Sequence, residues 1–421
     1  MERILNAVRT ETLKNSSITF TSTLINGALG ILFFLVAARF LGPISYGLLI
    51  VSITVNTLLT DVSDLGTDTG LVKFVSKYLK KDKTKAYQFL KLAFFIKLFV
   101  GIFVAVIGVL LSESIAVFVF SKPELTLPLK VASLGVLGAH LFDYSTHSLQ
   151  AFKKFYSWGG LFIGTNLIRL LLILLFVYIG NISTVNTLVI YILMPILGFL
   201  ISMFILPITF LRSKVTKSTR DDFFHYNKWV AVISLVSALA ARVDVFISAR
   251  FLTLEQVGIY AIANQLVQVF PQLASSLGTV FAPKMASIEN SRDLVSYLKK
   301  SQLLVSAIVV AGFIVLPSAF FFFPLLLGAS YVSSIPVFVT LFISMMIFLL
   351  SIPVHNAIFY YYSNPKLFSY LSVLNLFIVS ISSVIFINQF GTIGLALAVL
   401  LGNTINFEIP LIWLFKKLKE K

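Results

Sequence analysis

The sequence predicts an all-α membrane protein with about twelve transmembrane helices, and three observations lead to this fold class. Of the 421 residues, 58% are hydrophobic and only 12% are charged, which is about half the charged share of a soluble domain. The apolar residues form runs of about 20, the length of a helix that crosses a hydrocarbon core. Basic residues are concentrated in alternate connections between these runs. Because a backbone in lipid must satisfy its own hydrogen bonds, the runs are expected to be helices.

The expected spans follow one another closely along the chain. They are 17–41, 44–66, 88–112, 128–151, 158–180, 187–210, 229–252, 255–280, 301–325, 333–354, 367–388 and 391–415. The first run is too long for the core of a signal peptide and is interpreted as a retained helix. The even-numbered connections and both ends hold most of the 33 lysines and arginines, whereas the odd-numbered connections hold only Lys122. This bias predicts a cytoplasmic-membrane protein with both termini in the cytoplasm.

The net charge of +16 is explained by the same bias, so nucleic acid is not expected as a partner. The chain has no cysteine, which excludes disulfides and thiolate metal sites, and neither a cofactor nor a metal is predicted. The segment 71–81 has Leu71, Phe74, Val75 and Tyr78 on one helical face and lysines on the other. We expect this helix to lie on the cytoplasmic leaflet, held by anionic membrane lipids; a protein partner there is the alternative.

An internal repeat divides the chain. The segment 38–41 (Ala-Arg-Phe-Leu) recurs at 249–252 with an offset of 211, and 65–67 (Leu-Gly-Thr) recurs at 277–279 with an offset of 212. A further set of matches, beginning with Ala151 and Ala357, has an offset of 206. Six helices per half is an even number, so the two halves are expected to be parallel repeats.

Three regions are therefore predicted. They are an N-terminal six-helix lobe at 1–210, a cytoplasmic inter-lobe linker at 211–228 and a C-terminal six-helix lobe at 229–421. Two equal lobes around a central axis are typical of a transporter that works by alternating access. The sequence shows no catalytic motif, so an enzyme is not predicted.

Several motifs resemble those of the polysaccharide repeat-unit flippases, which belong to the multidrug/oligosaccharidyl-lipid/polysaccharide (MOP) exporter superfamily. They are Ala38-Arg39-Phe40-Leu41-Gly42-Pro43 with Tyr46-Gly47, then Asp64-Leu65-Gly66, and Arg242-Val243-Asp244 with Val257-Gly258-Ile259-Tyr260. The resemblance implies a pair of six-helix lobes, as in the multidrug (MATE) exporters, that moves a polyprenyl-(pyro)phosphate-linked oligosaccharide across the membrane for surface polysaccharide synthesis. Polysaccharide-assembly proteins are the partners it suggests. A cation-coupled multidrug antiporter of the same superfamily is the closest alternative.

Such a cargo needs fixed cations for its phosphate, and arginine suits phosphate because its planar fork binds two oxygens. Lys97, Arg169 and Arg242 lie within predicted spans, where a charge is costly and calls for a reason. An intramembrane ion pair is the alternative for each. The repeat-related Arg39 and Arg250 are further candidates, although snorkelling to the outer headgroups explains them equally well.

Coupling to H⁺ or Na⁺ has candidates in the fourth and seventh spans. His140, Asp143, His147 and Gln150 fall within a helical arc of about 80°, where a histidine and a carboxylate can relay protons. The alternatives are that these side chains line the cavity without coupling or form a hydrogen-bonded seam against another helix, and a metal site is weaker because only three ligands appear. Asp244 shares a face of the predicted seventh span with Ser234 and is the remaining candidate.

Neutral amides suit sugar hydroxyl groups. Gln265, Gln268 and Gln272 share one face of the eighth predicted span and are candidates for sugar contact or for interhelical hydrogen bonds. Asn26 and Asn56 are weaker candidates for the same cavity. Pro271 removes a backbone hydrogen bond and is expected to kink this span.

Overall fold

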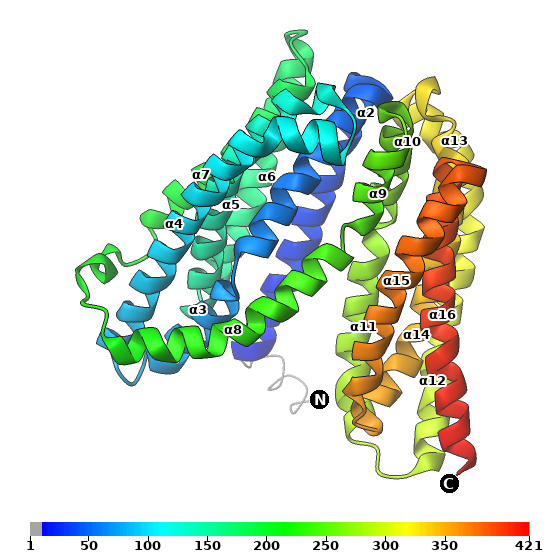
Figure 1. Cartoon of the computed structure of the whole chain (residues 1–421). Coiled ribbons are helices and arrows are strands. Elements are labelled where there is room, and N and C mark those ends of the chain that lie inside the picture. Colours follow the sequence, from blue (N-terminus) through cyan, green and yellow to red (C-terminus); the bar gives the residue numbers. More distant parts are fainter. Residues whose placement is uncertain (1–10, 421) are drawn as a thin grey trace. The chain divides into compact units, whose positions relative to one another are not determined.

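The computed structural model describes residues 11–420, which are helical over most of their length and contain no strand (Figure 1). The helices form two compact units. The N-terminal unit holds the chain up to Leu41 together with Leu48–Arg242. The C-terminal unit holds the short segment Gly42–Gly47 and the chain from Val243 onward. The predicted all-α class is confirmed.

The N-terminal unit is built around one central helix, α5, which packs against α3, α4, α6 and α7. Its elements are α2 (Glu11–Ser63), α3 (Thr67–Tyr78), α4 (Lys83–Ser114), the π-helix η1 (Ile115–Val119), η2 (Pro123–Leu125), α5 (Thr126–Ala151), α6 (Phe155–Tyr178), α7 (Thr184–Met203), η3 (Ile208–Arg212) and α8 (Lys217–Ala240). The expected linker at 211–228 lies within η3 and α8, and Phe223 of this segment is fully buried in the unit. The lobe boundaries given by the sequence therefore stay a prediction.

The amphipathic helix predicted at 71–81 exists as α3, but its apolar face packs on protein. Phe74 stacks on Phe89 of α4 with ring centroids 4.5 Å apart, and it meets Tyr226 of α8 edge to face at 5.7 Å. The ammonium of Lys73 lies 3.3 Å from the Tyr226 ring centroid, in a cation–π contact. The expectation that this face lies in lipid is wrong, because helix α8, far away in sequence, covers it.

The C-terminal unit repeats the plan, since its central helix, α14, corresponds to the fourth span of the second half and packs against α10, α11, α12 and α16. Its elements are α9 (Val243–Phe251), α10 (Leu254–Val267), α11 (Val269–Ala286), α12 (Ser291–Val315), η4 (Leu316–Ser318), α13 (Ala319–Leu327), η5 (Ala329–Tyr331), α14 (Ser334–Asn356), the π-helix η6 (Ala357–Tyr361), α15 (Pro365–Phe390) and α16 (Thr392–Lys419). The two units thus have the same order of helices, and in each unit the helix of the fourth predicted span is the central one.

Among residues 11–420, nine helices are long and apolar enough to cross a membrane, or ten if the pair α8 and α9 is one span bent by 42°. About twelve spans were predicted, and two features account for the difference. Helix α2 contains two predicted spans on either side of Gly42, which has a non-helical φ of 73°. The predicted span 255–280 is divided at Gln268 into α10 and α11. Pro271 lies three residues after this division and cannot donate to the carbonyl of the preceding turn, so a break here follows from the sequence.

The repeat-related glycines make a close backbone crossing in the C-terminal unit. A Cβ on Gly47 would overlap the carbonyl oxygen of Leu254, and a Cβ on Gly258 would overlap that of Pro43. Gly47 and Gly258 are 211 residues apart, as are Pro43 and Leu254, so the two contacts are related by the repeat. Only glycine permits so close an approach of two backbones.

One of the sequence matches is out of register. Lys153 and Ser363 have positive φ values of 57° and 51°, and each lies two residues before the helix that begins at Phe155 or Pro365. Both pairs are separated by 210 residues, close to the offset of the earlier repeat motifs. The match at an offset of 206 is therefore wrong by about one helical turn. In so apolar a sequence, side-chain identities alone do not fix register.

Candidate functional site

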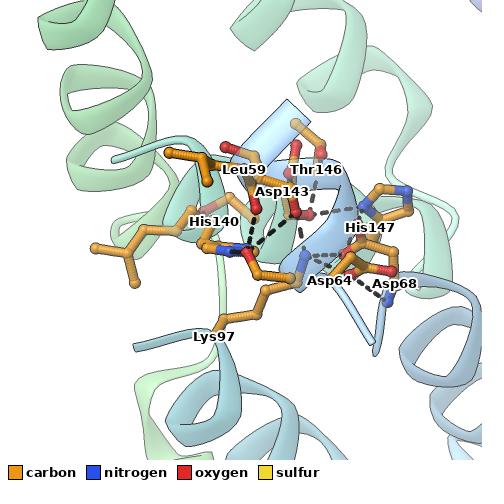
Figure 2. Close-up of polar contacts among 12 residues, drawn as sticks. Leu59, Asp64, Asp68, Lys97, His140, Asp143, Thr146 and His147 are labelled. Carbon is orange, nitrogen blue, oxygen red and sulfur yellow. Dashed lines mark hydrogen bonds and ion pairs between the residues drawn. The ribbon is translucent and has the colours of Figure 1, made fainter. Parts of the chain in front are cut away.

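A cluster of charged side chains surrounds Lys97 inside the N-terminal unit (Figure 2). The Lys97 side chain is 1% exposed, and its Nζ lies 2.6 Å from Asp64 Oδ1, 3.0 Å from Asp68 Oδ1 and 4.0 Å from Asp143 Oδ2. A buried ammonium is tolerated only when paired in this way. The ammonium contacts carboxylates on three sides, so the structure favours a role for Lys97 within this cluster over the predicted phosphate contact.

A left-handed turn brings Asp64 of the α2–α3 connection and Asp68 of the first turn of α3 to Lys97. Leu65 and Gly66 have φ values of 54° and 73°, and the Thr67 amide donates to the Asp64 carbonyl over 3.0 Å. The turn places Asp64 and Asp68 one helical turn apart on the side that faces α4. A Cβ at Gly66 would also lie 2.8 Å from Val230 Cβ, so glycine is needed both for the backbone conformation and for packing.

Two histidines of α5 extend the cluster. His147 Nδ1 lies 3.2 Å from Asp68 Oδ1 and 2.8 Å from the carbonyl oxygen of Asp143. Both neighbours are acceptors, so Nδ1 carries a proton. His140 is fully buried, and its Nε2 lies 2.7 Å from Ser63 Oγ. Burial raises the pKa of Asp68, but the opposing effects of Lys97 and His147 are together larger and hold it below its usual range.

A small acidic pocket opens beside this cluster. It has a volume of about 300 Å³, and its lining includes Asp61, Asp64, Asp68 and Asp143. Hydroxyl groups of Thr60, Ser234 and Ser237 complete the polar part of its wall. Arg242 pairs with Asp61 across 3.1 Å, so the predicted Arg242 site is a partly exposed ion pair. Within residues 11–420, no group of three or more histidine or acidic side chains is arranged to hold a metal ion.

Arg169 differs from the other two cations predicted within the spans. Its Nη1 donates to Asn166 Oδ1 over 2.8 Å, and its guanidinium lies 4.4 Å from the Tyr191 ring centroid and 5.7 Å from that of Phe33. Asn166 in turn donates to Asn26 on α2. No carboxylate of the described residues pairs with Arg169, and its Nε–H is buried without an acceptor. This guanidinium retains donor capacity for an anion.

Asn56 and Arg39 are the remaining candidates in the N-terminal half. Asn56 is 5% exposed, and its Nδ2 donates to the Ala132 carbonyl over 2.7 Å, which ties α2 to α5. Arg39 is exposed, as is its repeat counterpart Arg250 in the C-terminal unit. The structure therefore places Asn56 in a helix–helix seam and both arginines at the surface of their units.

The candidates of the second half do not form one constellation. Asp244 accepts from Tyr260 Oη over 2.8 Å within the C-terminal unit. Because the seventh span breaks between α8 and α9, the predicted shared face of Asp244 and Ser234 does not exist. Gln268 and Gln272 are exposed and Gln265 is half-buried. The break between α10 and α11 falls at Gln268, so the three amides do not share one continuous helical face.

Sequence reasoning assigned His140, Asp143 and His147 to one helical face, which the structure bears out in α5, but it missed the partners Asp64, just before α3, and Asp68, in its first turn. No role was assigned to Asp64 or Asp68 from the sequence. A signal for both was available. A lysine in the middle of an apolar span requires a carboxylate partner, and Asp64 and Asp68 have the spacing that puts two carboxylates on one helical side.

Comparison with known proteins agrees with this architecture. A family model described as "Polysaccharide biosynthesis protein" matches residues 12–289. No curated protein sequence matches the chain. Among solved structures, an inward-facing multidrug resistance MATE family transporter of the MOP superfamily superposes with a TM-score of 0.76 at 13% identity, over 98% of this chain and 99% of that one.

Two further structures share the fold. The lipid II flippase MurJ in an inward closed conformation has a TM-score of 0.71 at 17% identity, over 94% of this chain and 87% of that one. A MOP superfamily transporter from Pyrococcus furiosus has a TM-score of 0.62 at 13% identity, over 98% and 97% of the two chains. The predicted two-lobed MATE-like fold is confirmed.

Proposed function

Because the chain belongs to the polysaccharide biosynthesis protein family, we propose that it is a flippase that moves a polyprenyl-(pyro)phosphate-linked oligosaccharide across the cytoplasmic membrane by alternating access. The chain is a multi-pass membrane protein with the fold of flippases and transporters. The finer proposal concerns its cargo, and the bias of basic residues supports an orientation with both termini in the cytoplasm.

The observation that supports a phosphate-bearing cargo is the state of Arg169. Three cations were expected within the spans, and carboxylates neutralise two of them, Lys97 and Arg242. Arg169 is held instead by rings and an amide, which orient the guanidinium without cancelling its charge. A lipid phosphate is an anion that can meet such a group at the depth of the membrane.

The test is replacement of Arg169 by Ala or Lys in cells that depend on this protein for surface glycan. A hydrogen bond to a charged group contributes about 1.5–3 kcal/mol, so Arg169→Ala should lower export roughly 10- to 100-fold at equal protein level. Arg169→Lys should retain part of the activity. Arg212→Ala removes an exposed arginine outside the predicted spans and is the matched control. Normal export by Arg169→Ala would remove the support for a phosphate cargo.

The Lys97 cluster supports coupling to protons. An ammonium already lies among three carboxylates, and its positive charge opposes binding of a sodium ion there. Binding and release of a proton at the cluster changes its charge without moving this ammonium. The rate of transport in proteoliposomes should then depend on a pH gradient and not on a sodium gradient. Asp143→Asn should weaken the dependence on the pH gradient. Transport that is driven by a sodium gradient alone would contradict coupling to protons.

A multidrug antiporter is the second candidate, and the acidic pocket with its four aspartates favours it. Cationic drugs are attracted to carboxylates that have no counter-charge. Here every one of these aspartates pairs with Lys97, His147 or Arg242, which reduces the attraction. A deletion strain distinguishes the two functions, since loss of surface glycan supports the flippase and drug sensitivity with normal glycan supports the antiporter.

A further inference from the structure

A second cavity lies within the C-terminal unit, apart from the charged cluster. It has a volume of about 370 Å³ and lies between α11, the end of α14, the π-helix η6 and the start of α15. Its wall contains no acidic residue, lysine or arginine, and its one titratable nitrogen base is His355. A cavity of this size is at the lower end of the range for ligand pockets, so it suits one small ring.

Aromatic rings form one side of this cavity. Phe359 and Tyr360 are 44% and 41% exposed, and the Phe368 ring lies 6.0 Å from that of Phe359. Phe359 and Tyr360 belong to η6, in which the Tyr362 amide donates to the Ala357 carbonyl, five residues back. A π-helical turn is wider than an α-helical one and is frequent at functional sites. It allows two consecutive aromatic residues to reach the same cavity.

Polar groups with unused hydrogen-bonding capacity form the opposite side. Asn356 donates through Nδ2 to the Ile352 carbonyl over 2.8 Å, which orients the amide, and its Oδ1 has no partner among the described residues. The Ser275 hydroxyl and the Tyr360 hydroxyl also have none within residues 11–420. Both ring nitrogens of His355 already have partners, since Nε2 donates to the Asn406 carbonyl over 3.0 Å and Nδ1 lies 3.5 Å from Ser351 Oγ.

The repeat shows that this position has diverged between the two units. The Leu-Gly-Thr motif recurs at 277–279, and Gly278 and Thr279 line the cavity. In the N-terminal unit the same motif is flanked by Asp64 and Asp68 of the charged cluster. At the offset of 212, their counterparts are Ser276 and Val280. The surroundings of the Leu-Gly-Thr motif are therefore charged in the N-terminal unit, whereas in the C-terminal unit they are neutral and include aromatic rings.

We infer that this cavity is a saccharide subsite, in which a pyranose ring stacks on Phe359 or Tyr360 while its hydroxyl groups bond to Asn356, Ser275 and Tyr360. Ring C–H groups of a sugar carry partial positive charge and meet the negative face of an aromatic ring. Neutral donors and acceptors match its hydroxyl groups. The inference rests on the proposed function and assigns the binding of a sugar of the cargo to the C-terminal unit.

The test uses the full chain in nanodiscs and a panel of methyl glycosides, read by saturation-transfer NMR. We expect transfer that is strongest at the ring C–H groups. Tyr360→Leu should weaken binding about three- to tenfold, whereas Tyr360→Phe, which retains the ring, should keep most of it. Tyr370→Leu is the matched control, since Tyr370 is 74% exposed on α15 and does not line the cavity.

The outcomes separate this inference from the proposed function. Loss of glycoside binding in Tyr360→Leu but not in Tyr370→Leu supports the subsite. If no glycoside shows transfer, or if a polyprenyl phosphate without sugar competes for the site, the subsite is wrong. The flippase proposal then still stands on Arg169 and on export in the deletion strain. If deletion of the protein leaves surface glycan unchanged, the flippase proposal fails whatever the glycosides do.

Discussion

Replacement of Lys97 by Met tests whether the charged cluster holds the N-terminal unit together. Methionine keeps an unbranched side chain of similar length and removes the ammonium. Removal of one partner from a buried ion pair costs about 3–5 kcal/mol, because the remaining charge stays buried. Asp64 and Asp68 are 14% and 17% exposed, so water still reaches part of each carboxylate. We therefore expect Lys97→Met to lower the free energy of unfolding by about 3 kcal/mol, the lower end of this range.

The assay is thermal unfolding of the purified protein in detergent. A loss of about 3 kcal/mol corresponds to a fall of about 6–12 °C in the apparent unfolding temperature for a unit of this size. The loss should be smaller at mildly acidic than at mildly alkaline pH, because protonation of the carboxylates removes their mutual repulsion. Adding Asp64→Asn and Asp68→Asn to Lys97→Met should restore most of the stability.

The matched control is Lys130→Met, which makes the same substitution at an exposed lysine of α5. It should leave the unfolding temperature within experimental error. If Lys97→Met were as stable as the parent protein at both pH values, the reasoning would be refuted, since the carboxylates would then not need the ammonium.

Three further perturbations have definite expected outcomes. Gly258→Ala places a methyl group against the Pro43 carbonyl and should destabilise the protein by about 1–3 kcal/mol in the same unfolding assay. Asn56→Ala removes the bond to the Ala132 carbonyl and should cost about 1 kcal/mol while leaving glycan export normal; lost export at full stability would instead return Asn56 to the sugar path. The lowered pKa of Asp68 means that its contribution to stability is complete above the unfolded value of about 4 and is lost as pH falls through the lower folded value. Asp68→Asn should therefore flatten the acid limb of a stability-against-pH profile, and an unchanged limb would contradict the assignment.

The fold class could be predicted from the sequence because a backbone in lipid must satisfy its own hydrogen bonds and therefore forms helices or closed barrels. Apolar runs of spanning length and the bias of basic residues predicted an all-α bundle, and the Gly42–Pro43 break was expected between the first two spans. The break between α8 and α9 was not expected. Residues 229–252 form an uninterrupted spanning segment in the sequence, without a proline, and nothing local marks Ala241 and Arg242 as non-helical.

The site was only partly accessible for a different reason. Periodicity identifies which side chains share a helical face, and it correctly grouped His140, Asp143 and His147 on α5. It does not identify which other helix supplies their partners. The left-handed turn at Leu65 and Gly66 carries Asp64 and Asp68 back toward α4, and this is a tertiary contact. Lys97 and Arg169 are equivalent as isolated charges in the sequence, and only their neighbours distinguish a neutralised cation from an available one.

The assignment of Gly42–Gly47 to the C-terminal unit has a consequence for connectivity. The chain leaves the N-terminal unit after Leu41, re-enters it at Leu48 and leaves it again after Arg242. Three covalent tethers therefore join the units, and any rotation between them is confined to torsions near these three points. Gly42 stands at the first tether with its φ of 73°, and the helix is already interrupted at the third.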